Sequence, residues 1–553
     1  MGIIKNPILS GMAPDPSILR VGNDYFIATS TFHWRPAIQI FHSKDLANWL
    51  LYTYALKNHE INLRGTNTPA GIWAPHLSYD KKTQTYWLCY SFMNNMAGRE
   101  FNGDSYVVWA NDIKGPWSKP IYLTSVGFDP SLFHDDDGRH YLAILEWENR
   151  TGYQAPGTIV LSEIELSSYQ KTAQIKGWKR ITHGFTTRGC VEAPQIYKHK
   201  DYYYLLLASG GTGYGHGIEI GRAKNIFGPY EGNPTGEPII TSNPAHLFSL
   251  GDPDAGHFEM FNPNSEMQKA GHGSIVETPN GEIYIAHLMS RPLPNTILNP
   301  LGRETSLQKM VWTENDWLQL EDGSNLAKMV IPAPQNLAII EQNHFDIEEY
   351  FGNNEIPLCF MTPYHQATEE WVDVNTKGEI KISGRGSLFS QVNPAILATR
   401  ATSHHYFIET KLLFDPTHYS QSAGVGLYYD SNNWIFARLT TSYDETRTVL
   451  RLIKATLGEK EDFIYGEVEI PQKELALRLH YHYGKASIEY SVLNNPWKIL
   501  AENIDVSYLS DEGVNGEPGE IGGFTGLFNF IGAVDTYQHD SWASFTYYLV
   551  KNS

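Results

Sequence analysis

Three observations predict an all-β chain, a five-bladed β-propeller followed by an antiparallel β-sandwich. One pattern occurs five times: a Pro or Gly, an alternating apolar strand, a polar turn and a second strand centred on Tyr. Helical periodicity is almost absent, and after Trp317 the repeat gives way to plain alternating strands. Repeats of three to four strands are typical of propeller blades, and alternating strands separated by turns are typical of a sandwich.

The five copies of the repeat can be aligned by their first residues, and each reads as a β-hairpin. The copies are DPSILRVGNDYFIATS from Asp15, APHLSYDKKTQTYWLCYS from Ala74, DPSLFHDDDGRHYLAIL from Asp129, APQIYKHKDYYYLLLAS from Ala193 and HGSIVETPNGEIYIAHL from His272. The alternative is a large sandwich with chance similarity, which five spaced copies make hard to sustain.

A proline-containing segment, MVIPAPQNL at residues 329–337, separates the two halves. We therefore expect the propeller over residues 1–330, a linker over 331–338 and a lectin-like sandwich that closes the active site over 339–553. Three scattered cysteines suit neither a disulfide framework nor a zinc site. With no secretory signal or membrane-spanning run in the sequence, we expect a cytoplasmic protein, and also a homo-oligomer.

Composition narrows the class of partner. The chain has 61 acidic and 42 basic residues, and the net charge of −19 repels phosphate backbones. We therefore expect neither a nucleic acid nor a membrane partner. Aromatic residues make up 13% of the chain and offer stacking surfaces for an uncharged ligand such as a sugar, although β-rich chains favour aromatics in any case.

The starts of the repeats should converge, because the innermost strand of every propeller blade lines one central channel. Four repeats start with a residue that precedes proline: Asp15, Ala74, Asp129 and Ala193. A residue before proline is pushed towards extended backbone. We therefore expect these four residues to share an extended conformation at one end of the channel.

One pocket would then gather Asp15, Asp129 and His272, with Trp73 and Glu192 beside them. Trp73 and Glu192 are one residue out of register, and strict alternation would turn them to the opposite face. Three carboxylates in an aromatic pocket suit glycoside hydrolysis: one donates a proton, one activates water, and a third can raise the pKa of the acid. The alternative for each Asp-Pro pair is a turn at the start of a strand.

At these residues the chain resembles glycoside hydrolase family 43, in its branch of β-xylosidases and α-L-arabinofuranosidases with a C-terminal β-sandwich. The resemblance spans nearly the whole chain. Its motifs are PDPSI, YFIATSTF, GIWAPHLSY, GFDPSLFHD, VEAPQIY, GGTGYGH, GHGSIVET, PLGRETSLQK, QSAGVGLYY and GFTGLF. It implies an exo-acting, inverting enzyme that releases xylose from the non-reducing end of β-1,4-xylo-oligosaccharides.

The resemblance also implies roles for single residues. Asp15 matches the general base, Glu192 the general acid, and Asp129 the third carboxylate that tunes and orients the acid. Inversion places base and acid roughly 6.5–9.5 Å apart. The residues expected to bind substrate are Phe32, Trp73, Thr212, His272, Arg303 and, reaching over from the sandwich, Phe528, with Trp34 as a weaker candidate. The alternatives are a surface ion pair for Arg303 and the sandwich core for Phe528.

Some points stay open at the level of sequence. His272 is a candidate ligand for a Ca²⁺ ion on the propeller axis, as in some relatives, although the chemistry itself needs no cofactor. Gln195 departs from the Glu-Gly-Pro-His run of many relatives, which leaves α-L-arabinofuranosidase activity open. A non-catalytic carbohydrate-binding propeller and an interaction scaffold are further alternatives, and the three carboxylates argue against both.

Overall fold

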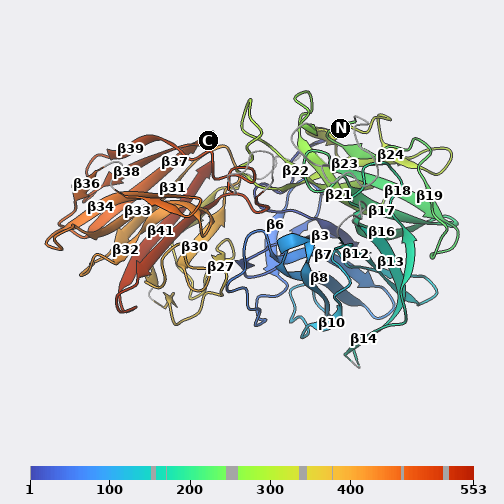
Figure 1. The fold of residues 1–553 in the computed structure, drawn as a ribbon, viewed down its shortest axis with the longest axis horizontal. Coiled ribbons are helices and arrows are strands. Elements are labelled where there is room, and N and C mark those ends of the chain that lie inside the picture. Colours follow the sequence, from blue (N-terminus) through green and yellow to red (C-terminus); the bar gives the residue numbers. More distant parts are fainter. Residues whose placement is uncertain are drawn as a thin grey trace.

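The computed structural model describes residues 2–150, 157–169, 171–244, 260–335, 345–375, 378–462, 466–514 and 522–552. Two lobes lie side by side, a propeller drawn in blue to green and a sandwich drawn in orange to red (Figure 1). Across these ranges the only helical element is the short 3-10 helix η1 (Ala97–Arg99), and no helix is long and apolar enough to cross a membrane. The predicted fold class is confirmed.

Five antiparallel sheets of the described chain form the blades, and each inner strand lies at the start of one sequence repeat. Blades one and two contain β2 (Ser17–Val21), β3 (Asp24–Thr29), β5 (Gln39–Ser43) and β6 (Leu50–Tyr54), then β7 (Gly71–Asp80), β8 (Thr85–Asn95), β9 (Asn102–Ala110) and β10 (Ile121–Thr124). Blade three contains β11 (Ser131–His134), β12 (His140–Glu146), β13 (Thr158–Ser167), β14 (Thr172–Ile175) and β15 (Lys179–Thr182). Blades four and five contain β16 (Glu192–His199), β17 (Tyr202–Ser209), β18 (Gly217–Ala223), β19 (Glu231–Gly232) and β20 (Ile240–Thr241), then β21 (Gln268–Glu277), β22 (Ile283–Ser290), β23 (Glu304–Trp312) and β24 (Leu318–Leu320).

The residue that opens each repeat has a left-handed backbone conformation, so the expectation of extended backbone was wrong. The angle φ is 56° at Asp15, 41° at Ala74, 58° at Asp129, 51° at Ala193 and 47° at His272. A following proline disfavours the right-handed helical region, but it does not by itself select extended backbone. Left-handed backbone costs a non-glycine residue about 1–2 kcal/mol, so the surrounding sheets must hold it in place.

β-Bulges in blades two and four explain why strict strand alternation does not apply at Trp73 and Glu192. The pairing of β7 with β8 shifts register between Trp73 and His76, and that of β16 with β17 shifts between Glu192 and Gln195. A bulge re-aims side chains locally. Trp73 and its neighbour Ala74 therefore both reach the central pocket.

The N-terminal segment is tied to the end of the propeller. Strand β1 (Ile3–Lys5) pairs with β25 (Val330–Pro332). The side chain of Asn6 donates a hydrogen bond to the carbonyl oxygen of Leu307 at 2.8 Å and accepts one from its amide at 2.9 Å. Residues 336–344 fall outside the described ranges, so the predicted linker is described only in part and the domain boundaries stay a prediction.

The sandwich consists of two packed sheets with an apolar core between them. One sheet contains β26 (Ile347–Glu349), β28 (Val372–Asp373), β29 (Ile380–Ser383), β31 (His405–Leu413), β37 (Glu474–His482), β38 (Lys485–Ser491), β39 (Lys498–Asp505) and β41 (Trp542–Asn552). The other contains β30 (Ala395–Arg400), β32 (Gln421–Asp430), β33 (Asn433–Thr441), β34 (Thr448–Thr456), β35 (Glu459–Glu461), β36 (Glu467–Glu469) and β40 (Phe528–Asp535).

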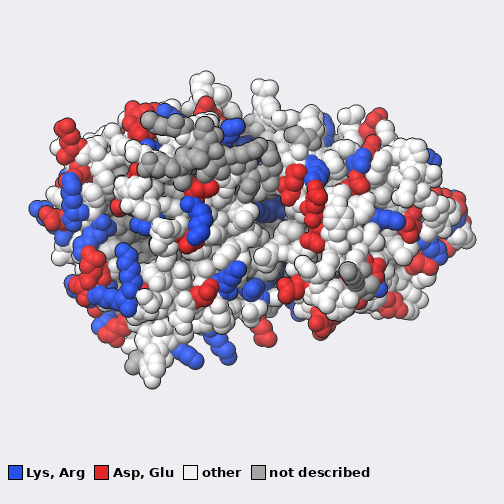
Figure 2. Space-filling model, turned by 180° about the vertical axis from the view of Figure 1, so that it is seen from behind, with Lys and Arg blue, Asp and Glu red and all other residues white. Residues whose placement is uncertain are grey.

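The surface carries its charge in mixed form. On the face shown in Figure 2, acidic and basic side chains are interspersed over both lobes. Elsewhere in the described chain, Lys198 forms ion pairs with Asp135 and Asp136. A nucleic acid backbone requires a broad basic surface, and the mixture of charges on this face does not provide one.

The two lobes are joined by a short ladder and a stacked aromatic pair. Strand β4 (Trp34–Arg35) of the propeller pairs with β27 (Thr362–Pro363) of the sandwich. Trp34 stacks on Phe528 with ring centroids 3.7 Å apart, and both side chains are wholly buried. Phe528 therefore packs in the interface between the lobes and does not line the central pocket, so the expectation that it walls the pocket was wrong.

We predict that Phe528→Ala destabilises the protein. Truncation of a buried Phe costs about 3–5 kcal/mol, because the lost contacts leave a cavity. Urea unfolding should show this loss, whereas Tyr443→Ala, at a side chain that is 93% exposed, should change the free energy of unfolding by less than about 0.5 kcal/mol. Equal, small effects of the two substitutions would contradict the interface described above.

Candidate active site

A pocket of about 190 Å³ opens near the starts of the inner strands. Asp15, Asp129 and Glu192 reach it from blades one, three and four. The other predicted residues that line it are Phe32, Trp73, Thr212, His272 and Arg303. Of the predicted residues, Phe528 and the weaker candidate Trp34 do not line the pocket and instead stack on one another between the lobes.

Asp15 is fixed by Ser30 of its own blade and by His272 of blade five, and Ser30 is in turn held by blade two. Its Oδ2 accepts a hydrogen bond from the hydroxyl of Ser30 at 2.6 Å, and the same hydroxyl oxygen accepts one from the amide of Ala74 at 2.7 Å. Its Oδ1 lies 3.5 Å from Nδ1 of His272. The carboxylate thus has a defined orientation while it faces the pocket.

Asp129 and Glu192 are held next to one another. Oδ2 of Asp129 accepts a hydrogen bond at 3.1 Å from the amide of Ala193, the residue that follows Glu192. Ala193, whose backbone is left-handed, therefore connects the two acids, because its amide binds Asp129 and it follows Glu192 in the chain. This contact links the position of the Glu192 side chain to that of Asp129.

The three carboxyl groups share one poorly solvated space, and this favours bound protons. Burial raises the pKa of Glu192 to about 7, the negative charge of Asp15 adds to the shift, and Arg303 partly offsets it. Burial also raises the pKa of Asp129 well above its ordinary value, followed in size by the charges of Glu192 and Asp15. At neutral pH the pocket therefore retains a proton that three exposed carboxylates would lose.

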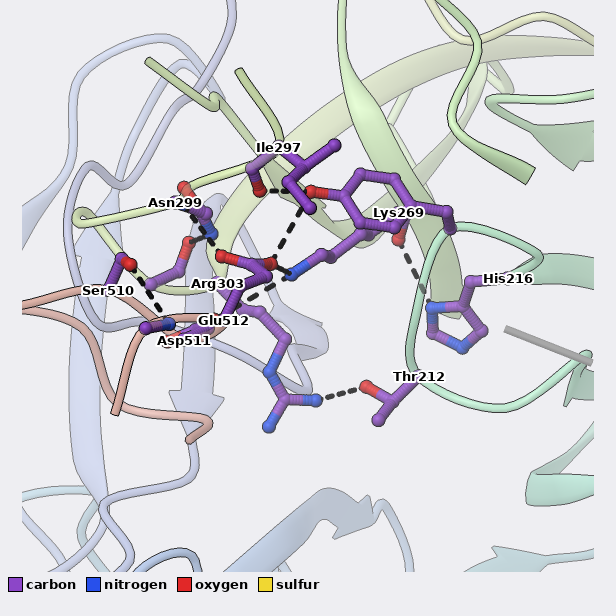
Figure 3. Close-up of polar contacts among 12 residues, drawn as sticks. Thr212, His216, Lys269, Ile297, Asn299, Arg303, Ser510, Asp511 and Glu512 are labelled. Carbon is purple, nitrogen blue, oxygen red and sulfur yellow. Dashed lines mark hydrogen bonds and ion pairs between the residues drawn. The ribbon is translucent and has the colours of Figure 1, made fainter. Parts of the chain in front are cut away.

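Arg303 is the positive charge of the pocket and is itself buried. One guanidinium nitrogen donates a hydrogen bond to the hydroxyl of Thr212 (Figure 3). The guanidinium carbon lies 4.1 Å from the ring centroid of Phe524 and 5.7 Å from that of Phe32. Stacking fixes the plane of the guanidinium, which presents a rigid fork of donors suited to hydroxyl groups.

Aromatic rings complete the wall, and sequence analysis missed several of them. Phe524 lies in the motif GFTGLF, four residues before Phe528. The motif was therefore correctly predicted to reach the pocket, but through Phe524 and not through Phe528. Phe128 lies in the motif GFDPSLFHD and was also passed over. Phe101 and Trp147, which stack at 4.3 Å, lie in no repeat or motif that could have identified them.

The residues around His272 do not fit the expected calcium site. Calcium normally takes six to eight oxygen ligands, and among the described residues no group of three or more His, Cys, Asp or Glu side chains could hold a metal ion. Burial lowers the pKa of His272, so its imidazole is neutral near pH 7. Hydrolysis by paired carboxyl groups needs no cofactor.

A propeller that brings three carboxyl groups into one aromatic pocket contains the groups that a glycoside hydrolase requires. The family model "Glycosyl hydrolases family 43" matches residues 4–318, and the model "Beta xylosidase C-terminal Concanavalin A-like domain" matches residues 348–551. The chain belongs to glycosyl hydrolase family 43, as its sequence motifs predicted.

Full-length relatives support this assignment. Xylosidase/arabinosidase 43B of Humicola insolens is 34% identical, with 99% of this chain and 97% of the relative covered. The β-xylosidase of Bacillus subtilis (strain 168) is also 34% identical, with 99% of both chains covered. The crystal structure of xylan β-1,4-xylosidase from Bacillus halodurans C-125 superposes with a TM-score of 0.90 at 35% identity and covers 99% of this chain and 100% of its own.

Proposed function

We propose that this protein is an exo-acting β-xylosidase that releases xylose from the non-reducing end of β-1,4-xylo-oligosaccharides with inversion. The observation that carries the proposal is the partly buried carboxyl group of Glu192, which lies in one pocket with Asp15 and whose surroundings raise its pKa to about 7. A small pocket walled by aromatic rings from both lobes suits a terminal sugar better than the middle of a polymer. The names of the relatives described above agree with this substrate class.

Each carboxyl group takes one role in the proposed reaction. Asp15, fixed by Ser30, removes a proton from water as the oxygen attacks the anomeric carbon. Glu192 gives its proton to the leaving glycosidic oxygen, so that its charge develops as the bond breaks. Asp129 orients Glu192 through the Ala193 amide, and Arg303 binds sugar hydroxyls.

An α-L-arabinofuranosidase activity is the second candidate. It is favoured by the name of the Humicola insolens relative, xylosidase/arabinosidase 43B, which covers both sugars. Gln195, the departure from the usual run after the acid, is buried, accepts a hydrogen bond from the hydroxyl of Tyr197 and does not line the pocket. The main proposal is therefore unaffected by it. The cytoplasmic location and the homo-oligomer stay predictions.

Proton NMR during hydrolysis of nitrophenyl β-xyloside, whose leaving group is not a sugar, tests the reaction. We expect α-xylose as the first product, because water activated by Asp15 attacks the face opposite to the leaving group. Nitrophenyl α-L-arabinofuranoside, assayed beside nitrophenyl β-xyloside, measures the second candidate. Initial release of β-xylose would contradict the assigned roles, since Asp15 would then have to act as a nucleophile.

Substitution of Glu192 should affect substrates according to their leaving groups. Glu192→Ala should reduce turnover of xylobiose about 10²–10⁴-fold and spare nitrophenyl β-xyloside in part, because nitrophenolate leaves with little protonation. Asp15→Ala should reduce turnover of both. Glu219→Gln changes a buried glutamate that lies outside the pocket and serves as the control. Equal losses on both substrates in Glu192→Ala would rule out Glu192 as the acid.

A further inference from the structure

A group of buried charges lies where the sandwich meets blade five. Lys269 on β21 is wholly buried, as are Asp511 and Glu512 from the loop that follows β39. The ammonium group of Lys269 donates a hydrogen bond to Oε1 of Glu512 and lies 3.9 Å from Oδ2 of Asp511 (Figure 3). Desolvation of such charges offsets much of their attraction, so they contribute little net stability. Their main physical effect is on geometry, because any displacement leaves a buried charge without its partner.

The acidic pair holds the loop that carries Arg303. Oε2 of Glu512 accepts a hydrogen bond from the amide of Asn299 at 2.7 Å, and the amide of Asp511 donates one to the carbonyl oxygen of Asn299 at 3.2 Å. The side chain of Asn299 in turn donates to the carbonyl oxygen of Gly302 at 2.6 Å. The backbone directly before Arg303 is thereby fixed to the sandwich.

The loop after β39, which contains Asp511 and Glu512, also holds the segment that carries Phe524. The carbonyl oxygen of Asp511 accepts hydrogen bonds from the amides of Gly522 and Gly523 at 2.9 and 3.0 Å. Oδ1 of Asp511 accepts one from the hydroxyl of Tyr429 at 2.5 Å. Phe524 follows immediately, and its ring lies against the guanidinium of Arg303. The two pocket residues that stack on one another are therefore positioned from one loop.

On the propeller side, Tyr214 and Lys269 connect the acidic pair to further pocket residues. The hydroxyl of Tyr214 donates to the carbonyl oxygen of Ile297 at 2.5 Å and lies 3.4 Å from Oε1 of Glu512. Tyr214 follows Thr212 by two residues, and Lys269 precedes His272 by three on β21. The acidic pair thus contacts the segments that carry Thr212, His272, Arg303 and Phe524.

We propose that Asp511 and Glu512, two acids of the sandwich domain, are positioning residues for the sugar pocket. They touch neither substrate nor catalytic carboxyl groups and act through Arg303, Phe524 and Thr212. The sugar pocket is complete only when the sandwich is docked, which gives this domain a part in substrate binding. The inference rests on the proposed function, since it names what organises that same pocket.

Kinetics of full-length variants test the inference. Glu512→Gln keeps the shape of the side chain and removes its charge. We expect the KM for xylobiose and the dissociation constant for xylose, measured by titration calorimetry, to rise together by about ten-fold, because misplaced binding groups weaken ground state and transition state alike. The apparent pKa values in the pH profile of kcat should stay unchanged, since Asp15, Asp129 and Glu192 have no contact with the acidic pair.

Two further variants keep the test decisive. Tyr214→Phe removes one hydroxyl without changing charge, and it should raise the KM for xylobiose and the dissociation constant for xylose to a smaller extent. If Glu512→Gln does not fold, Tyr214→Phe alone tests the inference. Glu409→Gln, which breaks the ion pair with Arg478 elsewhere in the sandwich, should leave both constants unchanged. Folded Glu512→Gln or Tyr214→Phe with wild-type constants, whatever its melting temperature, would overturn the inference. A wild type that neither hydrolyses xylobiose nor binds xylose would instead refute the proposed function.

Discussion

The crowding of three carboxyl groups in one buried pocket is the constraint on which the rest of the structure depends. Asp15, Asp129 and Glu192 cannot all be ionised at low cost in a space with little water. A proton is therefore retained near neutral pH, and the pKa of Glu192 rises to about 7. Arg303 limits this rise, and so the pocket can hold an acid and a base together. Reaction by inversion requires both states at once.

The three carboxyl groups come from separate blades, so their positions depend on the backbone conformation of each blade. Left-handed residues open all five repeats. The bulges after Trp73 and Glu192 allow both of these side chains to reach the pocket. The sandwich then adds Phe524 from outside the propeller. The pocket is therefore a product of both domains, and the interface between them is part of the site.

Much of this arrangement could be predicted from sequence, because it repeats. Five hairpins with aligned first residues predicted the blades and the convergence of Asp15, Asp129 and His272. Proline restricts its predecessor without specifying left-handed backbone, so the conformation was missed. Phe524 and Phe528 share one motif, and only packing against Trp34 shows which of them is buried. Lys269 and Glu512 are more than 200 residues apart, and no pattern links their charges.

The most direct test of the central claim is the titration of Glu192 itself, followed by carbon-13 NMR of protein labelled at the glutamate carboxyl carbon. Glu192→Gln assigns the signal and separates it from that of Glu219, a second glutamate, whose pKa is raised to about 7 by burial. The account predicts a pKa of about 7 for Glu192 and a lower value in Asp15→Asn, since the charge of Asp15 contributes to the shift. A Glu192 that titrates near the ordinary value of 4.5, with no response to Asp15→Asn, would contradict it.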